Sequence, residues 1–208
     1  MKYIQKPADP RKCKRTGGGD FTTTTTNEEL YAAYLSGDGN ALRVLMERYG
    51  NALTLYINGY MHDIHEAEDL MIEAFSRMIS AKPRLMKNGF KSYLYKTARN
   101  LALRHANKRR HHCCFSLEAL EDEPESGLLV EAVLQTEEQN RILHQCMEKL
   151  NPNYCEALYL LYFEDMSYAQ AAQVMGKTTK QIDHLLERGK KALRPLLEQE
   201  GITDAQYR

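Results

Sequence analysis

Apolar side chains recur with the spacing of an α-helix in the long segments of this chain. Between Leu42 and Tyr60, and again between Ala67 and Ile79, they follow the pattern i, i+3, i+4, i+7. This spacing places them on one face of an α-helix, whereas a half-buried strand alternates with a period of two. Strand-like alternation occurs nowhere along the 208 residues. The sequence therefore predicts an all-α fold.

Local signals mark where helices begin and end. Thr26 and Glu29 fit a capping box, so a first helix is expected over about 27–36, ended by Gly37 and Gly39. A loop bracketed by Pro83 and Gly89 precedes another strong helix. The expected buried stripe of that helix is Phe90, Leu94, Ala98, Leu101 and His105. A different face of the same helix carries one positive ridge, formed by Lys96, Asn100, Arg104 and Lys108.

Charge is segregated along the chain. There are 28 basic and 28 acidic residues in total, yet no Asp or Glu lies between Ala81 and Leu117. Aromatic rings among cations suit base stacking and backbone neutralisation in single-stranded nucleic acid, and Phe90, Tyr93 and Tyr95 lie in this segment. Solvated helix faces usually mix signs, so we expect a nucleic-acid partner. The ten basic residues of the segment are Lys82, Arg84, Lys87, Lys91, Lys96, Arg99, Arg104, Lys108, Arg109 and Arg110.

An acidic stretch divides the chain. From Ser116 to Glu138 there are eight acidic residues and no Lys or Arg, and Pro124 and Gly127 act as helix breakers. We therefore expect two small helical domains joined by an acidic linker. The expected parts are a flexible basic tail over 1–26, a helical domain over 27–112, the linker over 113–137, a second helical domain over 138–197 and a C-terminal tail over 198–208.

The second domain carries the pattern of a helix-turn-helix. Ser167 to Gln170 fits a capping box that opens a short helix, Gly176 closes it, and Thr178 to Gln181 fits a second capping box. The second helix of such a motif inserts into the major groove with its N-terminus first. An ordinary helical hairpin is the alternative. Small residues at Ala171 and Ala172, where the helices must cross closely, favour the DNA-binding motif.

No motif places a catalytic or metal-binding set. The five cysteines are irregularly spaced, and the adjacent potential ligands His111 to Cys114 fit a tetrahedral site poorly. We expect no metal, no cofactor and no enzymatic activity. The apolar runs are too short to span a bilayer, and the N-terminus lacks the apolar core of a signal peptide. A cytoplasmic protein without a membrane partner is expected.

Several motifs together resemble bacterial RNA polymerase sigma factors, above all the small extracytoplasmic-function group. Ala67-Glu68-Asp69-Leu70, followed by Glu73-Ala74-Phe75, resembles the region-two signature. Residues 92–102 resemble the promoter-melting helix that follows it. Leu150-Asn151-Pro152, residues 162–168 and the helix-turn-helix resemble region four. The resemblance covers about 28–110 and 138–197, in the order and spacing of the family.

This resemblance implies a partner, core RNA polymerase, and two contacts with promoter DNA. Core polymerase would bind Asp69 and Glu73 of region two. Single-stranded and minus-ten DNA would contact Lys82, Arg84, Lys87, Tyr93, Lys96, Arg99, Asn100, Arg104 and Lys108. Duplex minus-thirty-five DNA would contact Thr178, Thr179, Lys180, Gln181, Asp183, His184, Arg188 and Lys191. An anti-sigma protein is a further possible partner.

Some positions depart from the family pattern. Tyr93 stands where Trp is frequent, and Arg104 replaces a common acidic residue. Asp183 and Leu185 stand where basic residues are usual, and Gly189 stands where Ala is usual. Two alternatives stay open, and Asp183 and Leu185 favour only the second, against which the intact basic ridge argues. A stand-alone helix-turn-helix regulator would bind duplex DNA without polymerase, and a polymerase-binding adaptor would have lost promoter specificity.

Overall fold

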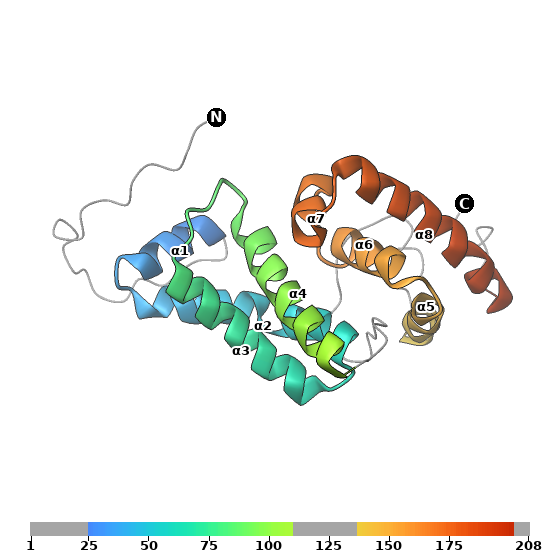
Figure 1. The fold of residues 1–208 in the computed structure, drawn as a ribbon, viewed down its shortest axis with the longest axis horizontal. Helices are drawn as coiled ribbons and strands as arrows, with labels where there is room; N and C mark the ends of the chain where they lie inside the picture. The colour runs from blue at the N-terminus through green and yellow to red at the C-terminus, as the bar shows by residue number, and fades with distance from the viewer. Residues whose placement is uncertain (1–24, 110–136, 202–208) are drawn as a thin grey trace.

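The described residues form two groups of helices. The computed structural model describes residues 25–109 and 137–201, and every regular element within these ranges is an α-helix, which confirms the all-α prediction. The first group contains α1 (Asn27–Leu35), α2 (Gly39–Met61), α3 (Ile64–Ala81) and α4 (Phe90–Arg109). The second contains α5 (Glu137–Glu148), α6 (Pro152–Tyr162), α7 (Tyr168–Met175) and α8 (Thr179–Gln199). Figure 1 shows the first group, blue to green, beside the second, yellow to red.

Three of the predictions concern segments that lie largely outside these ranges. The N-terminal tail, the acidic linker and the 111–114 segment are not described, apart from Thr25, Thr26 and Glu137. Within the described ranges, no helix is long and apolar enough to cross a membrane.

Helix starts follow the local signals closely. Thr26 caps α1, with its side chain accepting a hydrogen bond from the Glu29 amide and the Glu29 carboxylate accepting one from the Thr26 amide at 2.9 Å. One part of the prediction was wrong, because Gly39 does not help to end α1. It is the first residue of α2, which Asp38 caps through the Asn40 amide at 3.0 Å.

Aromatic rings fill the core of the first group. Phe90, at the start of α4, packs against Tyr31 of α1 and Tyr49 of α2, with ring centroids 5.8 and 5.6 Å apart. The predicted buried stripe of α4 is confirmed at its first four positions, while His105 is only half-buried. Burial extends instead to Tyr95, which is completely inaccessible. The helix is therefore covered on more than one face.

The second group is held by close helix crossings. Gly176 ends α7 with a positive φ of 66°, as predicted, and Thr178 then caps α8. Gly189 of α8 lies so close to α6 that a Cβ there would be 3.2 Å from Leu158 Cδ1 and from Tyr154 Cβ. The departure from Ala at this position thus allows α8 to lie directly on α6.

The two groups pack against each other through α2 and α4 of the first group and α6 and α7 of the second. Tyr56 of α2 and Tyr159 of α6 lie with ring centroids 5.8 Å apart, and the buried side chains of both groups form one continuous cluster. Helix α4 contacts the helix-turn-helix through α7. In this structure the basic helix therefore lies at the junction of the two groups.

Candidate nucleic-acid interface

The helix-turn-helix presents a polar surface at the start of α8. Ile182 and Leu186 are buried against α6 and α7, while Leu185 is only partly buried. The helical spacing of Ile182, Leu185 and Leu186 predicts that all three point inward, and this holds fully for two of them. The predicted DNA contacts are all exposed: Thr178, Thr179, Lys180, Gln181, Asp183, His184, Arg188 and Lys191. The Thr178 hydroxyl and Gln181 also form the capping box, with the Gln181 side chain accepting from the Thr178 amide at 2.9 Å.

One face of α4 forms an open basic ridge. Lys96, Asn100 and Arg104 are exposed and lie one helical turn apart. Lys108 continues the same face within α4, but its side chain is outside the described part. The loop before α4 adds three exposed cations, Lys82, Arg84 and Lys87. The cations Lys82, Arg84, Lys87, Lys96 and Arg104 are thus open to solvent.

The three rings of the basic segment do not share one environment. Phe90 and Tyr95 belong to the core, so the expectation that they could stack on bases was wrong for this structure. The helical spacing of the apolar residues placed Phe90 on the core face of α4, whereas Tyr95 lies outside that stripe and is covered by other helices. Tyr93 is half-buried and is the ring of the three that stays partly accessible.

Arg99 is largely buried between the two helix groups, whereas a DNA contact is expected to be exposed. Its side chain is only 16% exposed, and its Nε donates to Glu156 Oε1 at 2.6 Å. Burial lowers the pKa of the Arg99 guanidinium, but the hydrogen bond and charge of Glu156 raise it more, so it stays protonated. The Tyr56 hydroxyl donates to the same carboxylate oxygen at 2.9 Å.

A second carboxylate covers the beginning of α4. Glu164, which follows α6, lies 3.1 Å from Lys91 Nζ and accepts from the Tyr95 hydroxyl at 2.5 Å. Sequence analysis missed both Glu156 and Glu164. The available signal was an acidic residue inside an otherwise apolar helix, since Glu156 stands between Cys155 and Ala157, where a buried charge requires a partner.

The expected polymerase-binding residues lie on the outer face of α3. Asp69 is exposed, and Glu73 forms an ion pair with Arg77 at 2.7 Å, with side chains 41% and 47% exposed. Ile72, beside them, is 54% exposed. The surface thus combines acidic groups with an exposed aliphatic side chain.

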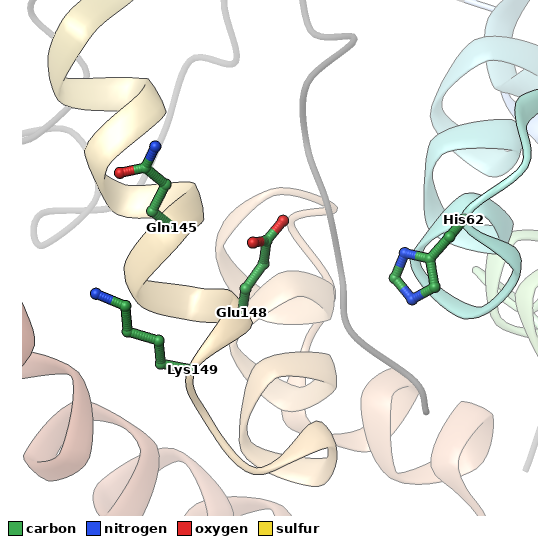
Figure 2. Close-up of a pocket in the computed structure, with 4 residues that line it drawn as sticks. All are labelled: His62, Gln145, Glu148 and Lys149. Carbon is green, nitrogen blue, oxygen red and sulfur yellow. The ribbon is translucent and has the colours of Figure 1, made fainter. Parts of the chain in front are cut away.

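An open cleft of about 540 Å³ lies elsewhere in the molecule, and none of these residues lines it. Figure 2 shows His62, at the end of α2, across the cleft from Gln145, Glu148 and Lys149 at the end of α5. Within the described residues, no three His, Cys, Asp or Glu side chains gather as a metal site would require.

Comparison with known sequences identifies two sigma-70 regions in this chain. Residues 45–112 match the family described as Sigma-70 region 2, and residues 140–193 match Sigma-70 region 4. The RNA polymerase sigma-H factor of Pseudomonas aeruginosa is 28% identical over 194 residues, covering 84% of this chain and 97% of that protein. The ECF RNA polymerase sigma factor SigM of Bacillus subtilis is 26% identical over 163 residues, covering 77% and 96%.

Solved structures show the same fold. CnrH, in complex with the cytosolic domain of CnrY, aligns with a TM-score of 0.59 at 19% identity, over 83% of this chain and 97% of CnrH. The sigma factor RpoE of Bartonella quintana, in complex with the anti-sigma factor NepR, aligns with a TM-score of 0.56 at 18% identity, over 76% and 96%. The two matched regions together cover more than half of the sequence, in the family order. The chain therefore belongs to the sigma-70 family of RNA polymerase sigma factors and is similar to its extracytoplasmic-function group.

Proposed function

We infer that this protein is a sigma factor that binds core RNA polymerase and directs promoter recognition, DNA melting and transcription initiation. The observation that carries this function is the presence of region two and region four in one chain, in family order. Each region also presents exposed groups suited to its role. The protein would act as a non-enzymatic initiation factor in the cytoplasm, where polymerase and promoter DNA are found.

We assign the contact with core polymerase to the outer face of α3. Asp69 and Glu73 lie one turn apart on this face, and the exposed Ile72 adds an apolar contact. Charged groups around an aliphatic side chain are typical of protein interfaces, in which polar groups surround a buried centre. The pairing of Glu73 with Arg77 leaves the second carboxylate, Asp69, as the main candidate for an ion pair with polymerase.

We assign the contact with minus-ten DNA to the loop before α4 and to the open ridge. Lys82, Arg84 and Lys87 would hold the phosphates near the melted bases, and Tyr93 would stack on an unstacked base. The ridge of Lys96, Asn100, Arg104 and Lys108 would follow the backbone. Arg99 would join them only after leaving Glu156.

Minus-thirty-five duplex is assigned to the first turns of α8. Thr179, Lys180, Asp183 and His184 would contact base edges, since only the N-terminal end of such a helix reaches them. Arg188 and Lys191 lie farther along and would contact phosphates, while Thr178 and Gln181 hold the helix start. Asp183 could accept a hydrogen bond from cytosine N4.

The domain division is proposed on the same basis. Region two would occupy 27–112, the acidic linker 113–137 and region four 138–197. An anti-sigma protein is a further candidate partner, because RpoE of Bartonella quintana was solved with the anti-sigma factor NepR.

In vitro transcription with purified core polymerase tests this function. A promoter library with varied minus-ten and minus-thirty-five elements should yield transcripts from a limited set of sequences only when the protein is added. Binding to duplex DNA without polymerase and no transcripts would instead identify a stand-alone regulator. Binding to polymerase with no promoter selection would identify an adaptor.

A further inference from the structure

Helix α4 has a glycine where other helices of this protein have a capping side chain. The residue before Phe90, the first of the helix, is Gly89, whose carbonyl accepts a hydrogen bond from the Tyr93 amide at 3.0 Å. Six other helices are each capped by a flanking Thr, Asp, Asn or Ser, namely Thr26, Asp38, Asp63, Asn151, Ser167 and Thr178. The first amides of α4 therefore need an acceptor from elsewhere in the molecule.

A tight turn explains why glycine stands at this position. The Gly89 amide donates to the Met86 carbonyl at 2.9 Å, and Asn88 between them has a left-handed φ of 58°. A Cβ on Gly89 would lie 2.8 Å from the Met86 carbonyl oxygen and 3.2 Å from the Met86 amide nitrogen. Both are backbone atoms, so a capping Ser, Thr, Asp or Asn at position 89 would force the turn itself to shift.

The carboxylate of Glu28, in the first turn of α1, supplies the missing acceptor. Its Oε1 accepts from the Phe90 amide at 3.3 Å, between residues 62 positions apart in sequence. A carboxylate is favourable there because the N-terminus of a helix carries a partial positive charge. The first turn of α4 contains no Asp or Glu and includes Lys91, whose charge has the unfavourable sign. Glu28 thus brings in a negative charge that α4 does not provide for itself.

The start of α1 is fastened to α2 beside this contact. Arg48 donates to Asn27 Oδ1 at 2.7 Å, and Asn27 Nδ2 donates to the Tyr49 hydroxyl at 2.6 Å. The ring of Tyr49 in turn packs on that of Phe90, with centroids 5.6 Å apart. The backbone next to Glu28 is therefore held in place relative to the start of α4.

We propose that Glu28 is a positioning residue for promoter melting, which holds the loop of residues 82–89 in a fixed position relative to the first turns of α4. The three exposed cations of this loop precede the Phe90 amide, and Tyr93 follows it three residues later. The cap thus lies between the groups assigned to phosphates and the ring assigned to an unstacked base. The cap itself stands on the contacts above, whereas its role in melting rests on the function inferred for the loop and Tyr93.

The direction of the effect separates positioning from simple electrostatics. A solvated carboxylate near DNA repels phosphates, so its removal should strengthen DNA binding. A positioning carboxylate has the opposite effect, because without it the loop samples other positions and the apparent affinity falls with the competent fraction. The loss of a capping side chain changes a local equilibrium of this kind by about fivefold.

The test compares Glu28→Ala with Glu28→Gln in the full chain. Alanine removes the acceptor, whereas glutamine removes the charge and keeps an acceptor oxygen. Glu28→Ala should weaken binding of a single-stranded minus-ten oligonucleotide, and lower open-complex formation with core polymerase, by about fivefold. Its affinity for core polymerase should not change. Glu28→Gln should stay within about twofold of wild type in each assay. Hydrogen exchange of the Phe90 amide, followed by NMR, should be about fivefold faster in Glu28→Ala.

Glu29→Ala is the matched control. Glu29 is the next residue of α1 and carries the same charge, but its carboxylate accepts from the Thr26 amide and so caps α1 itself. Its replacement removes one negative charge and one helix cap without touching α4. Oligonucleotide binding, open-complex formation and Phe90 exchange should therefore remain at the wild-type level. An equal defect in Glu29→Ala would mean that Glu28 only supports the fold of α1.

Glu28→Asp guards against a folding defect in the alanine variant, since it keeps the charge and draws the carboxylate back from α4. It should change exchange and binding in the same direction as alanine. Wild-type DNA binding and melting by any variant whose Phe90 amide exchanges faster would overturn the positioning role, and unchanged exchange in Glu28→Ala would overturn the cap. Failure of the inferred function has a separate sign. Polymerase with the wild-type chain would then give no promoter-selective transcripts, while Phe90 exchange would still report the cap.

Discussion

Replacing Asp69 and Glu73 with Ala should weaken the complex with core polymerase while leaving the fold almost unchanged. Both residues lie on the outer face of α3, and the ion pair between Glu73 and Arg77 has side chains 41% and 47% exposed. Solvent screens such a pair, so its loss should lower the free energy of unfolding by only ~0.2–1 kcal/mol. For a chain of this size, that corresponds to a shift in Tm of at most about 4 °C.

The effect on binding should be larger, because both carboxylates would be removed from a desolvated interface. A loss of about 1.4 kcal/mol already weakens the complex tenfold. We expect at least this reduction, measured as the dissociation constant for fluorescently labelled protein and purified core polymerase. Urea unfolding followed by circular dichroism measures the stability in parallel.

Helix α2 offers a matched control. Arg43 and Glu47 form an exposed pair with the same i, i+4 spacing, with side chains 62% and 60% exposed. Glu47→Ala should therefore cost a similar, small amount of stability and leave polymerase binding at the wild-type level. Wild-type binding by the double variant, or an equal loss in Glu47→Ala, would refute the assignment of α3 as the docking face.

Three further predictions concern other parts of the molecule. Tyr93→Ala removes a stacking surface worth ~1–3 kcal/mol per base, so permanganate footprinting of the promoter should show fewer reactive thymines. Tyr93→Phe keeps the ring and should behave as wild type. Equal thymine reactivity with the wild type and both variants would mean that the ring only packs inside the protein. Asp183→Ala should relax the preference at one base pair by ~1–3 kcal/mol in a selected promoter library, whereas stronger binding to every sequence would exclude base reading. Burial raises the pKa of Tyr49 to about 12. The folded protein therefore keeps this proton where the unfolded chain ionises, so stability is full below about pH 10 and falls as pH rises toward 12. Urea unfolding at about pH 8 and about pH 11 should show a smaller alkaline loss for Tyr49→Phe, and equal losses would contradict this role.

The parts of the structure that were predictable depend on neighbours in sequence. Caps at Thr26, Ser167 and Thr178 were identified because a capping side chain bonds to an amide two or three residues away. The apolar faces of α2 and α3 followed from helical spacing for the same reason. Gly39 was misread because a glycine is compatible both with a turn and with the first residue of a helix.

The parts that were not predictable depend on residues far apart in sequence. Arg99 lies on α4 at a spacing compatible with an exposed cation, yet its partner Glu156 is 57 residues away. Helical spacing states which residues share a face, but not which element covers that face. Tyr95 was misassigned for the same reason, because Glu164 and the rings of other helices enclose it.

Tyrosines at the junction give the protein a built-in optical signal. The chain contains 13 Tyr and no Trp, so tyrosine dominates its near-ultraviolet absorption and emission. Tyr56 lies at the centre of a cluster, with the rings of Tyr60 and Tyr95 from the first group at 5.6 and 5.1 Å and that of Tyr159 from the second at 5.8 Å. Aromatic circular dichroism depends on such fixed environments. Movement of Tyr159 away from Tyr56 should therefore change the near-ultraviolet spectrum of the unlabelled protein, so the relative position of the two regions can be followed without any dye.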